Sequence, residues 1–260
     1  MKSLFVAWQN PESREWIPVA KLTRTDNQYN LQYTRGAMRC PGFRGLGRMN
    51  TMDATYVSNK LFPFFQNRLL HKNRPEYKKL IEWLALDDIN EDPMDILIGT
   101  GGLRSTDSFE LIPQPNIQNN KLSLNFFVRG LRYLPDGAIS FIDQLEKGST
   151  LLLMKDFQNP TDHKAFALRI SSKPVIIGYL PKYFCSGIHN LIGNNESPEV
   201  KVVKINKDAP LDMRCLCNAS ASIPEKFNLI DDTEDFLPWD QHAFDSSVTK
   251  TLNNSNLDFD

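Results

Sequence analysis

One arginine-rich segment near the start of the chain has the residue types that hold an anion. Its cations are Arg35, Arg39, Arg44 and Arg48. Four glycines lie among them, and no acidic residue follows until Asp53. Guanidinium groups and free backbone N–H groups are the donors that bind phosphate. The pattern indicates a phosphate-contacting loop at residues 35–50, with an ordinary solvated loop as the alternative.

A histidine beside an aspartate raises the question of metal or acid-base chemistry. His163 directly follows Asp162, and Asp156 lies six residues earlier. A catalytic site holds such groups around a substrate, and no third partner stands at a recognisable spacing. We therefore expect His163 to be structural, and we expect no enzyme, no cofactor and no metal. The other histidines, isolated in the sequence, are His71, His189 and His242.

The cysteines do not form a recognisable framework. They are Cys40, Cys185, Cys215 and Cys217. No CxxC pair occurs, and Cys215 and Cys217 are too close together, without a nearby histidine, for a usual zinc site. We expect four reduced thiols.

Composition and charge exclude several classes of protein. The 260 residues are 41% hydrophobic and 23% charged, which excludes a disordered or fibrous chain. No apolar run reaches the length of about 18 to 20 residues needed to span a bilayer. The first residues do not resemble a signal peptide, because polar residues interrupt them from Gln9 onwards. We expect a cytoplasmic protein without a membrane partner.

The net charge of −1 hides a strong asymmetry along the chain. It is +2 for residues 1–120, +4 for 121–204, 0 for 205–230 and −7 for 231–260. The basic part permits a polyanionic partner. Residues 231–260 are predicted to be an acidic, largely disordered tail. Its island at 236–239, Phe-Leu-Pro-Trp, is interpreted either as a docking motif or as a nucleic-acid mimic covering a basic groove.

Hydrophobic spacing predicts an α+β fold whose first domain spans residues 1–115. Strands are predicted at 3–8, 15–22, 29–34 and 106–113, and helices between 57 and 86, with a break at Arg74-Pro75, and at 92–98. The three opening strands would form a β-meander. Residues 113–120 are predicted to be a linker.

Residues 4–113 resemble the first N-terminal subdomain of HipA-type proteins. The resemblance depends on the third strand ending at Tyr33, on the run from Tyr56 to Leu70 (Y-x-S-x-x-L-F-P-F-F-x-N-x-L-L) and on Thr100-Gly101-Gly102. HipA proteins are bacterial Ser/Thr kinases of toxin–antitoxin systems, with their kinase residues C-terminal to this subdomain. Beyond residue 120 we find neither a Gly-rich nucleotide loop nor a catalytic Asp followed by a metal-binding Asn, so the resemblance does not imply kinase activity.

Residues 121–230 are predicted to form a small β-barrel-like module. Strands are predicted to begin at 124, 150, 165, 175 and 198, with helices at 138–145 and 182–191 and a last strand near 213–217. The strand at 150–156 is expected to be buried.

This second stretch resembles the HIRAN domain. The matching residues are Gly130-Leu131-Arg132-Tyr133, then Asn159-Pro160-x-Asp162-x-x-Ala165-x-Ala167, then Ile177-Gly178-Tyr179-Leu180-Pro181-Lys182. HIRAN domains occur alone in bacteria and fused to remodellers and helicases in eukaryotes, where one member holds the 3′ end of single-stranded DNA. The resemblance therefore implies DNA, single-stranded or at a 3′ end, as the partner.

The resemblance assigns a role to each site residue. A 3′ end needs an acceptor for its hydroxyl, aromatic faces for the last bases and cations for the phosphates. Asp162 would accept from the hydroxyl, and Asn159 would brace the loop or contact the sugar. The aromatic faces would be Tyr133 and Tyr179, and the cations Arg132, Lys182 and Lys164.

Each of these residues also has a purely structural interpretation. Asn-Pro-x-Asp is a common turn in which Asn and Asp bond their own backbone. The tyrosines can be ordinary packing residues and the cations solvated surface charges. In addition, HIRAN domains often have an aromatic residue where this chain has Thr161, so one stacking face is missing.

Two functions remain open from the sequence. The first is non-catalytic binding of nucleic acid, at single-stranded 3′ ends or damaged DNA. The alternative is an antitoxin-like regulator that binds a HipA-type kinase through the N-terminal domain. Salt dependence separates them, because phosphate contacts weaken steeply with salt.

Overall fold

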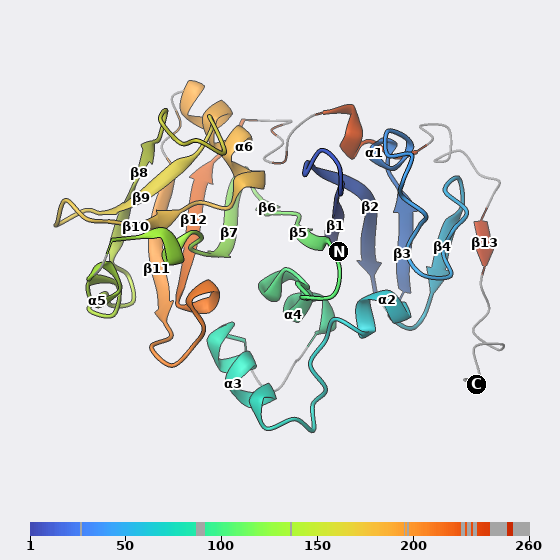
Figure 1. The fold of residues 1–260 in the computed structure, drawn as a ribbon, viewed down its shortest axis with the longest axis horizontal. Coiled ribbons are helices and arrows are strands. Elements are labelled where there is room, and N and C mark those ends of the chain that lie inside the picture. The colour runs from blue at the N-terminus through green and yellow to red at the C-terminus, as the bar shows by residue number, and fades with distance from the viewer. Residues whose placement is uncertain are drawn as a thin grey trace. The chain divides into compact units, whose positions relative to one another are not determined.

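A computed structural model describes residues 1–26, 28–86, 92–135, 137–194, 196, 198–224, 227, 230, 233–239 and 249–251. The chain folds into two compact units (Figure 1). The first comprises Met1–Tyr77, Ile89–Gln114 and Asp232–Asp260, and the second comprises Lys78–Asp88 and Pro115–Asp231. The chain therefore passes from one unit to the other more than once.

The first unit is built on a six-stranded sheet in the order β13-β4-β3-β2-β1-β5. Its strands are β1 (Lys2–Gln9), β2 (Trp16–Thr25), β3 (Gln28–Tyr33), β4 (Thr55–Ser58), β5 (Phe109–Pro113) and β13 (Thr249–Thr251). Neighbouring strands are antiparallel, except that β13 runs parallel to β4. Three of its helices are α1 (Arg35–Met38), α2 (Pro63–Gln66) and α4 (Pro93–Thr100).

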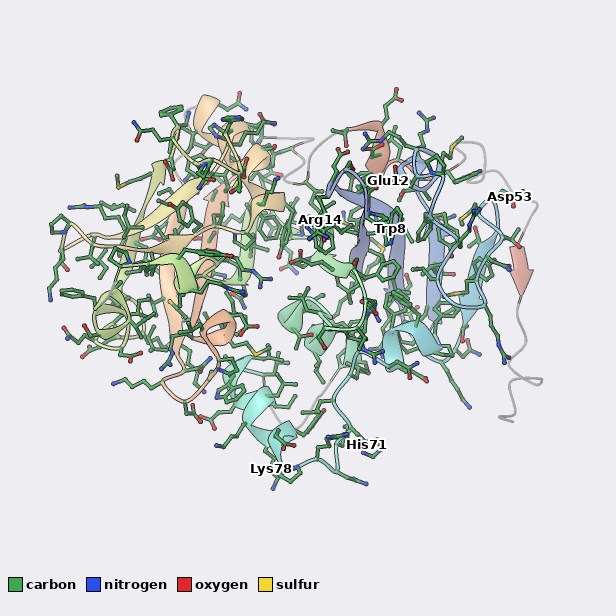
Figure 2. All side chains as sticks on the ribbon, in the orientation of Figure 1. Trp8, Glu12, Arg14, Asp53, His71 and Lys78 are labelled. Atoms are coloured by element: carbon green, nitrogen blue, oxygen red, sulfur yellow. The ribbon has the colours of Figure 1, made fainter. Side chains whose placement is uncertain are left out.

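The predicted β-meander is confirmed. On β1, Leu4 and Val6 are fully buried in the core, and Phe5 and Ala7 on the other face of the strand are buried as well. The β1–β2 turn is organised by Asn10, whose side-chain oxygen accepts from the N–H groups of Glu12 (2.8 Å) and Ser13 (3.2 Å). Figure 2 shows Glu12 in this turn, together with the neighbouring Trp8 and Arg14.

The helix predicted from residue 57 is wrong in its extent. Val57 belongs to β4, where it pairs with Asn30, and the first helix is the single turn α2, which Pro63 opens. Helix nucleation is costly, so apolar residues at helical spacing do not guarantee a long helix. Phe62 and Phe65 are buried in the core cluster of the first unit.

The predicted helix at 92–98 is confirmed as α4. Asp92 is its N-cap and accepts a hydrogen bond from the N–H of Met94 at 2.9 Å. The same carboxylate contacts Lys2 Nζ at 2.7 Å and is paired with Arg24. Burial alone would raise the pKa of Asp92, but the hydrogen bonds and these two cations outweigh it and lower the pKa. Gly101, in the left-handed region with φ 66°, ends the helix.

The second unit is built on a seven-stranded antiparallel sheet in the order β10-β9-β8-β11-β12-β7-β6. Its strands are β6 (Asn116–Gln118), β7 (Lys121–Phe127), β8 (Thr150–Lys155), β9 (Phe166–Ile170), β10 (Ile176–Tyr179), β11 (Glu199–Ile205) and β12 (Cys215–Ser222). Its α-helices include α5 (Ala138–Ile142) and α6 (Lys182–Gly193). Single turns of 3-10 helix are Leu131–Tyr133 and Leu211–Met213.

Three expectations about this unit are corrected. The predicted linker contains β6, which pairs with β7. The β-barrel-like module is not a closed barrel, because β10 and β6 stand at opposite ends of an open strand order. The strand at 150–156 is not buried: Leu152 is 42% exposed and Met154 is 41% exposed, because only one face of β8 contacts the core.

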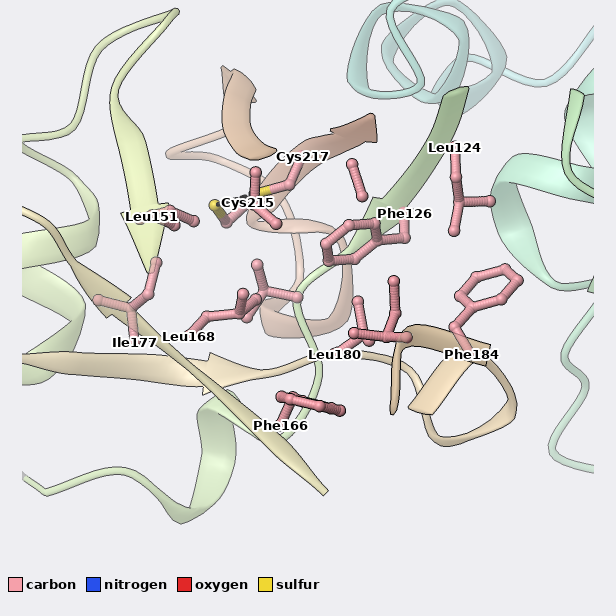
Figure 3. Close-up of a cluster of buried hydrophobic side chains, with 14 of the residues drawn as sticks. Leu124, Phe126, Leu151, Phe166, Leu168, Ile177, Leu180, Phe184, Cys215 and Cys217 are labelled. Carbon is pink, nitrogen blue, oxygen red and sulfur yellow. Dashed lines mark hydrogen bonds between the residues drawn. The ribbon is translucent and has the colours of Figure 1, made fainter. Parts of the chain in front are cut away.

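The core of this unit is formed by one face of the sheet together with α6 (Figure 3). Phe166, Phe184 and Leu168 are almost fully buried in it. Cys215 and Cys217 lie in the same cluster with their sulfur atoms 3.6 Å apart. The hydrogen bond with the thiol of Cys215, followed by burial, raises the pKa of Cys217, which keeps that thiol protonated.

Helix α3 (Glu76–Trp83) belongs to the second unit from Lys78 onwards. Trp83 donates its indole N–H to Asp208 at 3.1 Å, and its backbone carbonyl accepts from the Asn206 side chain at 3.0 Å. Lys204 Nζ reaches the carbonyl of Glu82 at 2.7 Å. The helix thus packs on the turn that follows β11. Lys78 marks the helix in Figure 2.

Over the described ranges, none of the helices is both long and apolar enough to cross a membrane.

Candidate nucleic-acid interface

Two glycines allow the end of β10 to approach the segment after β7. The backbone groups of Arg129 and Tyr179 exchange two hydrogen bonds, of 2.9 and 2.8 Å. At Gly178, with φ 132°, a Cβ atom would lie 2.4 Å from Val128 Cγ1 and 2.6 Å from the carbonyl oxygen of Arg129. At Gly130, with φ 77°, a Cβ would lie 3.2 Å from the Tyr179 ring. Glycine is therefore required at both positions, and the motif residues 130–133 and 177–182 meet here.

Asp156, which the sequence analysis did not assign to the site, connects Tyr179 to the predicted turn. One of its carboxylate oxygens accepts from the Tyr179 hydroxyl at 2.9 Å and from the Asn159 amide at 3.3 Å. Its backbone N–H donates to the carbonyl of Ala165 at 2.9 Å, which closes the Asp156–Ala165 loop at its base. The carboxylate thus fixes the Tyr179 ring and the loop relative to each other.

The turn itself is held by Asn159. Its side-chain oxygen accepts from the N–H groups of Thr161 and Asp162, both at 3.1 Å, and from the Thr161 hydroxyl at 2.9 Å. One of its two amide N–H groups donates to Asp156, so a single N–H donor is left for a ligand. The geometry therefore favours bracing of the loop over contact with a sugar.

Asp162 keeps accepting capacity. One carboxylate oxygen accepts from the backbone N–H of Lys164 at 2.9 Å, and the side chain is half-buried. An ionised carboxylate offers about four lone-pair sites, so several stay available to a hydroxyl donor. His163, next to it, is exposed.

The aromatic side chains of the site differ in how they are held. Tyr133 is 81% exposed, so it is not a core residue. Tyr179 is half-buried, and burial, followed by the Asp156 carboxylate, raises the pKa of its hydroxyl. Phe157 is 73% exposed on the Asp156–Ala165 loop and was missed by the sequence analysis. The presence of an aromatic residue in a polar turn could have indicated Phe157 from the sequence. Its ring offers a stacking face in place of the aromatic residue that is missing at Thr161.

The predicted cations lie on three different segments. Arg132 is exposed, with its guanidinium carbon 5.8 Å from the centre of the Tyr133 ring. Lys164 Nζ donates to Ser186 Oγ of α6 at 3.0 Å. Lys182 is the exposed first residue of α6. Its charge lowers the pKa of the buried Cys185 thiol, and the charge of Asp162 raises it. Burial is the main cause that raises the pKa of Cys185 to about 12.

His189 is a further neighbour of this site. Its ring lies 4.6 Å from the ring of Phe166, and its Nε2 atom is buried without a hydrogen-bond partner among the described residues. Burial, followed by the charges of Lys155 and Lys164, lowers its pKa, which favours the neutral imidazole. Sequence alone left His189 isolated, since its neighbours are distant along the chain. His71 is exposed and lies in the loop before α3 (Figure 2), and His242 falls outside the described residues.

The arginine-rich segment of the first unit does not present its four cations as one set. Arg35 lies 3.9 Å from Glu234, and Arg39 contacts Asp235 at 2.5 Å and Glu15 at 3.4 Å. Arg44 and Arg48 are exposed, and the described residues include no ion-pair partner for either of them.

A hollow of the second unit lies apart from this site. No group of three or more His, Cys, Asp or Glu side chains that could hold a metal occurs in the described part of the chain. A hollow of about 700 Å³ is lined by residues that include Asp143, Lys147 and Lys204. None of the predicted site residues lines this hollow.

Comparison with known proteins agrees with the resemblance of the second unit. Residues 121–223 match the family model of the HIRAN domain. The match begins at residue 121 and so leaves the HipA-like interpretation of residues 4–113 unconfirmed. No curated protein matches the chain.

Three solved structures are similar to part of the chain. The HIRAN domain of human HLTF is 18% identical, with a TM-score of 0.31, over 40% of this chain and 81% of that one. A protein from Lactobacillus plantarum is 16% identical, with a TM-score of 0.33, over 39% and 96%. The HLTF HIRAN domain in its DNA-bound conformation is 18% identical, with a TM-score of 0.27, over 40% and 76%.

Proposed function

We propose that the second unit is a non-catalytic nucleic-acid-binding module that holds the 3′ end of a single strand of DNA. The observation that carries the proposal is the Asp156–Ala165 loop: Asn159 and Asp156 fix it, and Asp162 stands on it as a carboxylate with free lone pairs. The HIRAN match supports nucleic acid as the ligand class, because a protein of that family was determined in a DNA-bound conformation.

The surroundings of the loop suit a strand end. Tyr133 and Phe157 offer exposed rings, and base–aromatic stacking contributes about 1–3 kcal/mol per base. Arg132, Lys164 and Lys182 supply positive charge for the last phosphates. Neither ring reads a base edge, so this arrangement favours binding that depends on the strand end and tolerates different sequences.

The test is fluorescence anisotropy of the full chain with oligonucleotides that differ only in a free 3′-hydroxyl or a 3′-phosphate. We expect the hydroxyl to bind more tightly, since a phosphate would meet the Asp162 carboxylate. Asp162→Asn keeps an acceptor oxygen but removes its charge, which should lower the affinity for the free end about five- to tenfold, since a hydrogen bond to a charged group contributes about 1–1.5 kcal/mol more than a neutral one. Asp212→Asn, an exposed aspartate on the second 3-10 turn, is the matched control.

Phe157→Ala addresses the stacking face. It should weaken binding by at least fivefold, given ~1 kcal/mol or more per stacked base. If both 3′ ends bind with equal affinity and Asp162→Asn leaves that affinity unchanged, the proposal that Asp162 holds the 3′ end is rejected. Binding that persists at high salt with little change would argue against phosphate contact altogether.

The second candidate function is regulation of a HipA-type kinase through the first unit. It is favoured by one observation: the acidic residues Glu234 and Asp235 contact Arg35 and Arg39, so this unit holds a peptide segment on its surface. Co-purification of the chain with a HipA-type kinase, resistant to salt, would support this role.

A further inference from the structure

A short stretch of the C-terminal part of the chain lies on the first unit like an added peptide. The stretch is Thr233–Trp239, which we term the acidic segment. Arg35 N donates to the carbonyl of Leu237, and Trp239 N donates to the carbonyl of Tyr33, both at 2.9 Å. Pro238 forms an antiparallel bridge with Thr34. Residues 237–239 therefore continue the backbone pairing beyond the end of β3, which is the way extended peptides bind to many receptor domains. Glu234–Phe236, just before them, form a single 3-10 turn.

Two aromatic side chains anchor the acidic segment. The Phe236 ring packs edge-on against Phe5, with centroids 5.0 Å apart and planes at 87°. Trp239 packs against the core cluster of the first unit and is partly buried. Buried aromatic anchors are the residues that dominate the binding energy of small interfaces.

Charge complements these anchors. Asp235 is 19% exposed and its carboxylate contacts the Arg39 guanidinium at 2.5 Å. Glu234 is 85% exposed and lies 3.9 Å from Arg35, so this second pair contributes little. Lys21 Nζ lies 5.2 Å from the centre of the Phe5 ring, which adds positive charge beside the Phe236 site. The receptor surface is thus cationic and aromatic, and its occupant is acidic and aromatic.

We propose that the first unit is a receptor for short acidic-aromatic peptides and that Thr233–Trp239 is its built-in ligand. The recognised pattern is an Asp-Phe pair followed by a Trp three residues after the Phe. A partner protein that carries this pattern, and whose Asp-Phe part forms the same 3-10 turn as Glu234–Phe236, binds by displacing the built-in segment. The main-chain bridge favours a peptide over a nucleic acid, whose backbone has no N–H group to donate to the Tyr33 carbonyl.

Tethering sets the expected size of the effect. A ligand on a short flexible tether has an effective concentration in the millimolar range. If the peptide binds the open surface with a Kd of about 10–100 μM, the built-in segment leaves the surface open about 1–10% of the time. A free peptide therefore binds the intact chain about 10- to 100-fold more weakly than a chain whose own segment is disabled.

The experiment uses the full chain and a labelled synthetic peptide of residues 231–241. The disabled chain carries Phe236→Ala and Trp239→Ala; a second version carries Glu234→Lys and Asp235→Lys and keeps both aromatic residues. Both should bind the peptide at least tenfold more tightly than the unmodified chain, with circular dichroism showing that the fold is retained.

Specificity is tested by reversing one ion pair. Adding Arg39→Asp to the disabled chain should abolish peptide binding, and a peptide with Asp235→Arg should restore it. Arg44→Asp is the control, since it removes an exposed arginine of the same segment and should have little effect. The proposal is overturned if neither disabled chain gains affinity, if a scrambled peptide binds equally well, or if only an oligonucleotide occupies the surface.

Discussion

Replacement of Gly178 by alanine tests the backbone arrangement on which the proposed interface depends. Its φ of 132° is a conformation that costs other residues about 1–3 kcal/mol. The added methyl group would also lie 2.4 Å from Val128 Cγ1, and forced overpacking costs typically another 1–3 kcal/mol. We therefore expect Gly178→Ala to lower the free energy of unfolding of the second unit by about 2–6 kcal/mol.

The matched control is Gly148→Ala. Gly148 also has a positive φ, 89°, but no atom lies within 4 Å of an added Cβ. It should show the backbone cost alone, about 1–2 kcal/mol. Urea denaturation gives both values, and their difference isolates the close contact.

Hydrogen exchange shows whether the Arg129–Tyr179 bridge itself is lost. Both backbone N–H groups are donors in that bridge, so both should exchange at least tenfold faster in Gly178→Ala. They should stay protected in Gly148→Ala, apart from the change due to global stability. Equal destabilisation by the two substitutions, with the bridge still protected, would refute the close approach and with it the placement of Tyr179.

Two further predictions follow from ionisation. Asp92→Asn keeps a good N-cap but removes the charge. The pKa of Asp92 is lowered in the folded state, so its charge stabilises the fold above the ordinary aspartate pKa, and this stabilisation is lost as the pH falls through the lowered value. In urea denaturation, the difference in unfolding free energy between Asp92→Asn and the unmodified chain should therefore shrink below about pH 4. A difference that does not change with pH would contradict this. Asp156→Asn should lower the raised pKa of Tyr179 but not fully to that of free tyrosine, because burial, its main cause, remains; ultraviolet titration measures it, and an unchanged pKa would exclude Asp156 as the partner.

Local patterns were sufficient for much of the first unit. Two apolar runs joined by a polar turn predicted the first two strands, alternation predicted the third, and the Asp92-Pro93 start predicted α4. The same reasoning failed at Val57, because strand pairing with Asn30 decides its state and that pairing is not a local property. Residues 116–118 were predicted to belong to a linker for the same reason: they form the strand β6 only through their pairing with β7.

The candidate site was predictable where turn chemistry is local. Asn159 and Asp162 bond to backbone within three residues, as an Asn-Pro-x-Asp turn predicts. Asp156 could not be assigned, because its partner Tyr179 is 23 residues away. The exposure of Phe157 could not be predicted either, because it depends on the tertiary packing around the ring.

The passage of the chain between the two units also has a consequence during synthesis. Trp83 of α3 meets Asp208, 125 residues later, and Arg39 meets Asp235, 196 residues later. At about 5–20 residues per second, α3 waits roughly 6–25 s on the ribosome for its partner, and Arg39 waits roughly 10–40 s. During that interval the receptor surface of the nascent first unit has no built-in occupant. A partner peptide that is present while the chain is being made therefore meets an open surface, whereas one that arrives later must compete.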